Sequence, residues 1–248
     1  MQLQKILLSI IFTGVLLKTT AQQPKEKQQV VALLQSVAQR YQGNNGLHFS
    51  IRYRYASEAK PSAWLDSLKG DFTMRDGLYR YSLDSTEYIG GREVSVILFK
   101  QDQLMYLTKG NNAFPKGNPL ALLDSIVLKN DSLDCRVEET KDRQTIILAF
   151  RPGQKTKRVE YVVDKHTGYV IKMISVVSAR ELYDPSVQEK VENDNTYAIV
   201  ETSFTNYRQA GPAEKEWDLT RLFKKAGKEY IPLAPYDNYK IVLGSPDL

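Results

Sequence analysis

Few residues of this chain have types and spacings that suggest catalysis or metal binding. The chain contains two histidines, His48 and His166, and one cysteine, Cys135. Neither histidine has a second histidine or a cysteine close to it in the sequence, whereas a zinc site needs several such ligands. We therefore expect His48 on the polar side of a strand and His166 in a surface turn. Cys135 alternates with apolar neighbours, which favours a buried strand position over a reactive thiol.

Motifs of nucleophilic and nucleotide-binding enzymes are absent from the sequence. It has no G-x-S-x-G, no S-x-x-K with its companion motifs, no H-E-x-x-H and no P-loop around Gly90-Gly91. Aspartate and glutamate together number 29, so an enzyme with two distant carboxylates stays open as an alternative. No acidic residue stands out, and we expect a protein that is not an enzyme and has no cofactor.

Arg75 is the basic side chain best placed for a binding role. It precedes the turn Asp76-Gly77 and is out of phase with Phe72 and Met74 on the same strand. One interpretation is a solvated arginine beside a turn. The other is a clamp that ties the sheet to a helix or binds a lipid carbonyl or phosphate.

Tyrosine is the most abundant aromatic residue, with fifteen in the chain. Its strand-spaced members are Tyr53, Tyr55, Tyr79, Tyr81, Tyr88, Tyr106 and Tyr161. They suit a β-rich core whose phenol groups reach water or backbone, and the alternative is the wall of a groove.

The pattern around these residues predicts strands and short turns. Gly70 to Tyr81 reads as a β-hairpin, because Asp-Gly between alternating apolar residues is a strong hairpin signal. Leu47 to Tyr55 alternates apolar and polar residues, which indicates an antiparallel sheet with one covered face. The other strands are expected at 93–100, 104–107, 132–138, 144–151, 158–163, 169–177 and 197–207.

Two helices are expected beside this sheet. Lys25 to Tyr41 has apolar residues at helical spacing, and Pro119 to Leu128 forms a short mid-chain helix. With about nine to eleven strands, the chain is mainly β (α+β) and forms a curved antiparallel sheet, a barrel or a half-barrel. The helices would close its concave side over an apolar cavity.

The first 21 residues predict export from the cytoplasm. Residues 1–21 resemble a signal peptide, with a basic start, an apolar run and small residues before a cleavage point. Removal of Lys5 and Lys18 lowers the formal charge from +5 to +3, with no concentrated basic patch for nucleic acid. Residues 22–248 are expected to form one domain, with a charged excursion at 181–195 and a less regular extension from about residue 211. The single cysteine in an exported chain favours the periplasm of a Gram-negative bacterium.

The order of these elements resembles the LolA-like outer-membrane lipoprotein carriers and lipoprotein-sorting proteins. The run Gly70 to Tyr81 resembles the family hairpin, and Arg75 and Tyr81 match its arginine and tryptophan. The run 119–123 resembles the mid-chain P-x-x-L-L helix, and 200–207 resembles the closing strand. The family implies an open half-barrel whose cavity takes acyl chains, with the arginine hydrogen-bonded to a helical lid. Ligand transfer would then need no covalent chemistry.

The resemblance and the residues together predict a periplasmic, non-enzymatic carrier for lipid or lipoprotein acyl chains. The expected partners are a lipid or an acylated lipoprotein and envelope membrane proteins, and the chain is expected to be a monomer. The alternative is a cell-envelope interaction module with a filled interior and no lipid. The expected ligand-binding residues are Arg75 as the polar clamp and a cavity wall of Phe49, Ile51, Phe72, Met74, Leu98, Met105 and Leu107.

Overall fold

The structure is a computed structural model that describes most of the chain after the predicted signal peptide. The described residues are 22–42, 46–76, 78–110, 133–182, 197–211, 217–227, 229–245 and 248. The predicted signal peptide, the predicted helix at 119–128 and most of the excursion at 181–195 lie outside these residues.

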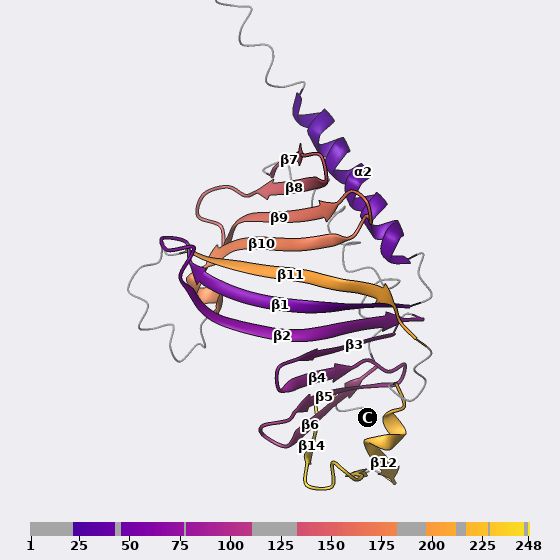
Figure 1. Ribbon diagram of the computed structural model, residues 1–248. Coiled ribbons are helices and arrows are strands. Elements are labelled where there is room, and N and C mark those ends of the chain that lie inside the picture. The colour runs from indigo at the N-terminus through magenta and orange to yellow at the C-terminus, as the bar shows by residue number, and fades with distance from the viewer. Residues whose placement is uncertain are drawn as a thin grey trace, which may run out of the picture.

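One large sheet carries most of the described chain (Figure 1). Its strands in chain order are β1 (Leu47–Ser57), β2 (Trp64–Arg75), β3 (Leu78–Leu83), β4 (Thr86–Ile89), β5 (Val94–Phe99), β6 (Leu104–Lys109), β7 (Asp134–Glu139), β8 (Arg143–Ala149), β9 (Thr156–Asp164), β10 (Val170–Ser178), β11 (Tyr197–Gln209) and β14 (Lys240–Leu243). Their order across the sheet is β14-β6-β5-β4-β3-β2-β1-β11-β10-β9-β8-β7. Neighbours are antiparallel except β14 and β6, which run parallel. The predicted mainly β class with one open antiparallel sheet is thus confirmed.

Among the described residues, five elements lie outside this sheet. The helix α2 (Gln22–Gln42) precedes β1, and the 3₁₀ turn η2 (Ala179–Leu182) follows β10. Near the C-terminus, the 3₁₀ turn η4 (Leu219–Arg221) leads into a two-stranded sheet of β12 (Phe223–Ala226) and β13 (Glu229–Pro232).

The apolar stripe of α2 explains its position. Val30, Leu34, Val37 and Tyr41 repeat at helical spacing and are at most 7% exposed. The first two pack on β7 and β8, and the last two on β1, β9 and β10. Figure 1 shows α2 crossing this end of the sheet. The predicted helix at 25–41 is confirmed, with three further residues at its start and one at its end.

Alternation along β1 defines the two faces of the sheet. Leu47, Phe49 and Ile51 lie on the side where α2 packs, which we call the helix face. The intervening residues His48, Ser50 and Arg52 lie on the other side, which we call the opposite face. Residues directly paired across antiparallel strands share a face, so the register assigns every strand to these two surfaces.

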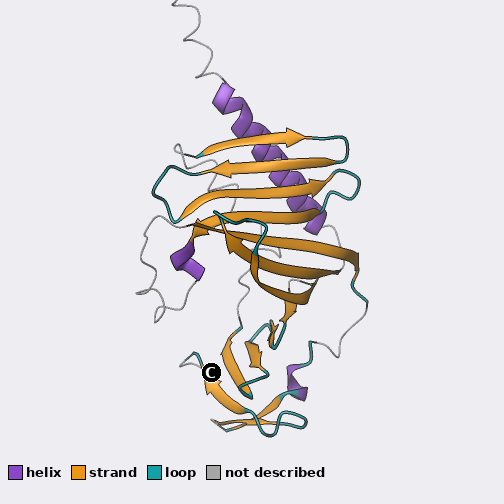
Figure 2. Cartoon of the chain, turned by 60° about the vertical axis from the view of Figure 1, so that its left-hand side comes forward, coloured by secondary structure: helices purple, strands orange, loops and turns teal. Residues whose placement is uncertain are grey.

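The two ends of the sheet bury cores on different faces. Under α2, the helix face contributes Leu47, Phe49, Cys135, Ile146, Leu148 and Val163. At the other end, β4–β6 bury their opposite face under the C-terminal segment, which comprises residues 217–227, 229–245 and 248. Figure 2 shows α2 and the C-terminal elements at opposite ends of the molecule. The C-terminal segment is therefore part of the core packing.

Most predicted strands are observed within a few residues of their expected ends. Strand β1 extends beyond the expected Tyr55 to Ser57, and β2 begins at Trp64, before the expected hairpin start at Gly70. Strand β4 was not expected, since Thr86–Ile89 is short and mixed in polarity. Strand β14 lies within the extension expected from about residue 211 and forms the edge of the sheet beside β6.

Candidate apolar ligand site

Four of the predicted wall residues lie together on the helix face. Phe49 pairs directly with Phe72, and Met74 pairs with Leu47. Ile51 follows Phe49 on the same face of β1, and Ile51, Phe72 and Met74 border the core that forms under the end of α2. Their shared face follows from the alternation that the sequence showed.

The other three predicted wall residues lie on the opposite face. Leu98, Met105 and Leu107 are 0% exposed and pack against the C-terminal segment. The register explains this, because Tyr88 on the helix face pairs with Ile97, which puts Leu98 on the other side. Strand β5 is apolar on both faces, so alternation alone did not show which face meets the other wall residues. The structure thus does not bring these three residues together with Phe72 and Met74.

A row of stacked rings continues the helix face across β1–β4. Ring centroids lie 5.0 Å apart for Phe49–Phe72, 6.0 Å for Phe72–Tyr79, 4.7 Å for Tyr79–Tyr88 and 5.3 Å for Tyr81–Tyr88. We call these five residues the aromatic row. The strand spacing of the tyrosines is compatible with a groove wall. That they adjoin Phe72 follows only from the register of β2 and β3, which the sequence does not show.

The aromatic row contains both buried and half-buried rings. Phe49 is 6% exposed under α2 and Tyr88 is 8% exposed, whereas Phe72, Tyr79 and Tyr81 are half-buried. Burial, followed by the neighbouring Tyr88, raises the pKa of both Tyr79 and Tyr81 above the ordinary value of 10.0. These phenols are therefore neutral at physiological pH, and the surface presents uncharged rings.

Arg75 lies at the end of β2 and binds backbone. Its guanidinium donates to the carbonyl of Gly211 at 3.0 Å and lies 3.5 Å from the Asp76 carboxylate. By strand position it belongs to the opposite face, away from Phe72 and Met74. In this structure Arg75 ties the hairpin to the chain after β11.

Three tyrosines attach the end of α2 to the sheet. The Tyr207 hydroxyl donates to the carbonyl of Val170 at 2.5 Å and lies 2.9 Å from the Tyr41 hydroxyl. Tyr169 stacks on Tyr207 with centroids 4.3 Å apart. Burial raises the pKa of Tyr41 to about 12 and also raises that of Tyr207. This attachment fixes α2 beside the aromatic row.

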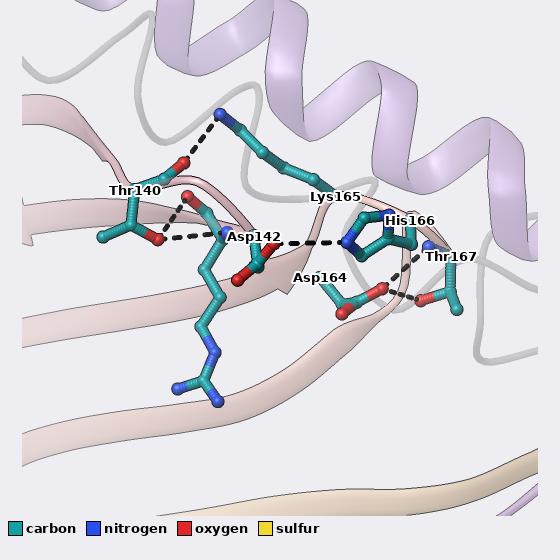
Figure 3. A network of polar contacts seen from close by, with 7 residues as sticks. Thr140, Asp142, Asp164, Lys165, His166 and Thr167 are labelled. Carbon is teal, nitrogen blue, oxygen red and sulfur yellow. Dashed lines mark hydrogen bonds and ion pairs between the residues drawn. The ribbon is translucent and has the colours of Figure 1, made fainter.

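Polar contacts join the β7–β8 turn to the β9–β10 turn (Figure 3). Lys165 donates to the carbonyl of Thr140 at 2.9 Å, and His166 lies 3.4 Å from Asp142. The Asp164 carboxylate accepts from the backbone and hydroxyl of Thr167. His166 is 73% exposed, which confirms its predicted surface turn position. These contacts hold the two adjacent turns together, which is a structural role.

The described residues offer no group of three metal-binding side chains. His48 binds Thr73 through Nδ1 at 2.9 Å and lies 3.5 Å from Asp71. The cysteine is buried, and burial raises the pKa of the Cys135 thiol. No described helix is both long enough and apolar enough to cross a membrane.

No protein-family model matches this sequence, and no curated protein matches it. Several solved structures do. The Pseudomonas aeruginosa MucA/MucB complex matches at a TM-score of 0.42 and 18% identity, over 83% of this chain and 63% of that one. The Mycobacterium tuberculosis lipoprotein LppX matches at a TM-score of 0.40 and 8% identity, over 75% of this chain and 99% of that one. A LolA superfamily protein from Nitrosomonas europaea matches at a TM-score of 0.32 and 7% identity, over 74% of this chain and 96% of that one.

The matching structures include a LolA superfamily protein and a domain of a putative outer-membrane lipoprotein-sorting protein, the kinds of protein that the sequence resembles. At these scores and identities the likeness concerns the course of the backbone and says nothing about ligands.

Proposed function

We propose that this protein is a non-enzymatic binding protein of the cell envelope, exported by a cleaved signal peptide, that holds lipid or lipoprotein acyl chains on its helix face. The observation that carries the proposal is the aromatic row with its aliphatic neighbours Ile51 and Met74. Half-buried rings on adjacent strands form a continuous uncharged surface, which a monomeric protein rarely presents without a ligand or partner.

The energetics suit an acyl ligand. Each methylene buried against such a surface contributes about 0.8 kcal/mol, so a long chain gains ample affinity without any polar contact. Flat rings adapt to a flexible acyl chain, because dispersion contacts between methylene groups and ring faces need no fixed partner geometry. Release of the acyl ligand would then require a partner or a conformational change that uncovers it.

The proposal assigns different roles to the residues predicted from the sequence. Phe49, Ile51, Phe72 and Met74 line the apolar surface, together with Tyr79 and Tyr81. Leu98, Met105 and Leu107 support it from behind as core residues of β5 and β6. Arg75 holds the hairpin end through Gly211 and acts on the ligand only by fixing β2.

Uptake of a fluorescent fatty acid by the full chain tests this proposal. We expect saturable binding that Phe72→Gln weakens by about ten-fold or more, a loss equivalent to about 1.4 kcal/mol. Leu65→Gln is the matched control, because Leu65 lies on the same strand and is 61% exposed. Equal binding by the wild type and both variants would contradict the assigned surface, and no binding at all would contradict the acyl ligand.

The second candidate is an envelope interaction module, favoured by a hollow of about 550 Å³ on the opposite face of β8–β10. Its floor includes Ile147 and Val176, and its rim includes Arg136, Arg151 and Arg158. An apolar floor with a basic rim suits an acidic peptide. Retention of an acidic partner by a protein that carries no lipid would favour this function over the carrier.

A further inference from the structure

A second hollow lies on the opposite face, over β11, β1, β2 and β3. Its volume is about 710 Å³, within the range of small-molecule sites. Charged and hydroxyl side chains dominate its lining, including Arg52, Lys69, Asp84, Ser82 and Ser203. The aromatic row lies on the other face, and Ile51 is the one residue of the proposed acyl surface that also lines this hollow. The inference below does not depend on that proposal.

Two cations face each other in this hollow. Arg52 on β1 pairs directly with Lys69 on β2, and both side chains are exposed. Neither forms an ion pair with any residue that the structure describes. Like charges at directly paired positions oppose strand pairing. A bound anion between them would remove this repulsion.

Four other cations on the same face have acidic partners. Arg54 and Lys172 both bind Glu201, at 2.7 Å and 3.1 Å. Lys100 binds Glu87 at 2.9 Å, and Arg80 binds the same carboxylate. The Arg52–Lys69 pair therefore differs from these neighbours, because neither of its cations forms an ion pair with a carboxylate among the described residues.

The acidic groups in the hollow are turned toward other donors. Asp71 accepts from the Ser50 hydroxyl at 2.9 Å, and Asp84 accepts from the backbone N–H of Lys69 at 3.2 Å. These carboxylates can still accept from ligand hydroxyls, as can Ser203 and Thr205 at the other side of the hollow. The hollow combines two cations that have no ion-pair partner among the described residues with several groups that can bind hydroxyls.

We infer that this hollow is a binding site for a phosphorylated polyhydroxyl compound, such as a sugar phosphate. Arg52 and Lys69 would bind the phosphate, because a guanidinium and an ammonium together provide several charged donors. Asp84, Ser82 and Ser203 would bind the hydroxyl groups. The same chemistry is found in a free sugar phosphate and in the phosphorylated polyol headgroup of a lipid.

Calorimetric titration of the full chain with glucose 6-phosphate, inorganic phosphate and glucose tests the site. We expect glucose 6-phosphate to bind about ten-fold or more tightly than either inorganic phosphate or glucose. The double variant Arg52→Gln/Lys69→Gln should lose about ten-fold or more of that affinity. The matched control, Arg92→Gln/Lys224→Gln, removes the same charge at two exposed positions outside the hollow and should bind as the wild type does.

Two further measurements complete the test. One identifies the source of the ligand, and the other separates this inference from the proposed acyl binding. Binding to phosphatidylcholine vesicles that contain phosphatidylinositol 4-phosphate, lost in the Arg52/Lys69 variant, would assign the site to lipid headgroups. Binding of soluble sugar phosphate alone would assign it to free compounds. Fatty-acid uptake should be unchanged in that variant, so failure of one proposal leaves the other intact. Absence of saturable binding of both glucose 6-phosphate and these vesicles would overturn the inference. So would an affinity for inorganic phosphate equal to or above that for glucose 6-phosphate, or full binding by the Arg52/Lys69 variant.

Discussion

Glu201 shows how the opposite face holds a nearly buried charge. It lies on β11, is 7% exposed, and its carboxylate binds Arg54 and Lys172. Burial raises its pKa, but the hydrogen bonds and charges of Lys172 and Arg54 outweigh burial and lower the pKa below the ordinary value of 4.5. A carboxylate with a lowered folded-state pKa stabilises the fold above that ordinary value, and the contribution disappears as pH falls through the folded-state pKa.

We predict that Glu201→Gln lowers the free energy of unfolding by about 1–3 kcal/mol at neutral pH, because both cations lose their partner. The variant should also lose less stability than the wild type as the pH falls below 4.5. Urea unfolding at several pH values measures both effects. The control is Glu229→Gln, since Glu229 is exposed. An unchanged pH dependence in Glu201→Gln would show that this carboxylate does not contribute to acid unfolding.

The Arg52–Lys69 pair predicts a substitution that increases stability. Without ligand, Arg52→Gln should raise the free energy of unfolding by about 0.2–1 kcal/mol, because it removes a cross-strand like-charge contact. The gain should shrink at high salt, which screens exposed charges. Chemical unfolding at low and high salt checks this, and a loss of stability at low salt would contradict the repulsion.

At the scale of elements, α2 and the tyrosines that attach it cover one end of the helix face. The apolar repeat of α2 and the alternation of β1 were readable from the sequence, because one side of each element is buried. The face occupied by Leu98 was not, because β5 is apolar on both sides and only the register through β4 decides it. Strand β4 itself was too short and too mixed in polarity to be predicted.

We predict that Tyr207→Phe weakens the attachment of α2. The Tyr41 hydroxyl would lose its partner while 7% exposed, which should cost about 1–2 kcal/mol of unfolding free energy. A raised phenol pKa stabilises the fold below the ordinary value of 10.0, and that contribution is lost as the pH rises through about 12 for Tyr41. Hydrogen exchange of α2 amides and alkaline unfolding measure the two effects. Unchanged exchange in α2 would show that Tyr207 does not attach the helix.

At the scale of the whole molecule, one sheet connects two cores on different faces. The sequence predicted a sheet covered by helices and a less regular extension, and it did not show that the C-terminal segment covers β4–β6 on the opposite face. That arrangement depends on long-range packing of Leu222 and Phe223, which no local pattern reveals. The candidate site was predicted only in part. Phe49, Ile51, Phe72 and Met74 lie on one strand pair and follow from local alternation, whereas the remaining wall residues depend on long-range pairing.

The continuous sheet predicts that both cores unfold together. Leu34→Ala in α2 and Phe223→Ala in β12 should each lower the free energy of unfolding by about 2–5 kcal/mol. Each variant should still unfold in a single transition, with a lower midpoint than the wild type. Circular dichroism and tryptophan fluorescence should give coincident curves for both variants. Two separate transitions, each sensitive to one variant, would instead show two independent units.

The central claim is that the helix face holds acyl chains beside the aromatic row. The most direct measurement is mass spectrometry of lipids extracted from the full chain, purified from its native cell envelope, with Phe72→Gln and Leu65→Gln purified in parallel. We predict acylated lipid in near-stoichiometric amount with the wild type and Leu65→Gln, and a marked loss with Phe72→Gln. Lipid-free wild-type protein, or lipid retained equally by all three proteins, would contradict the claim.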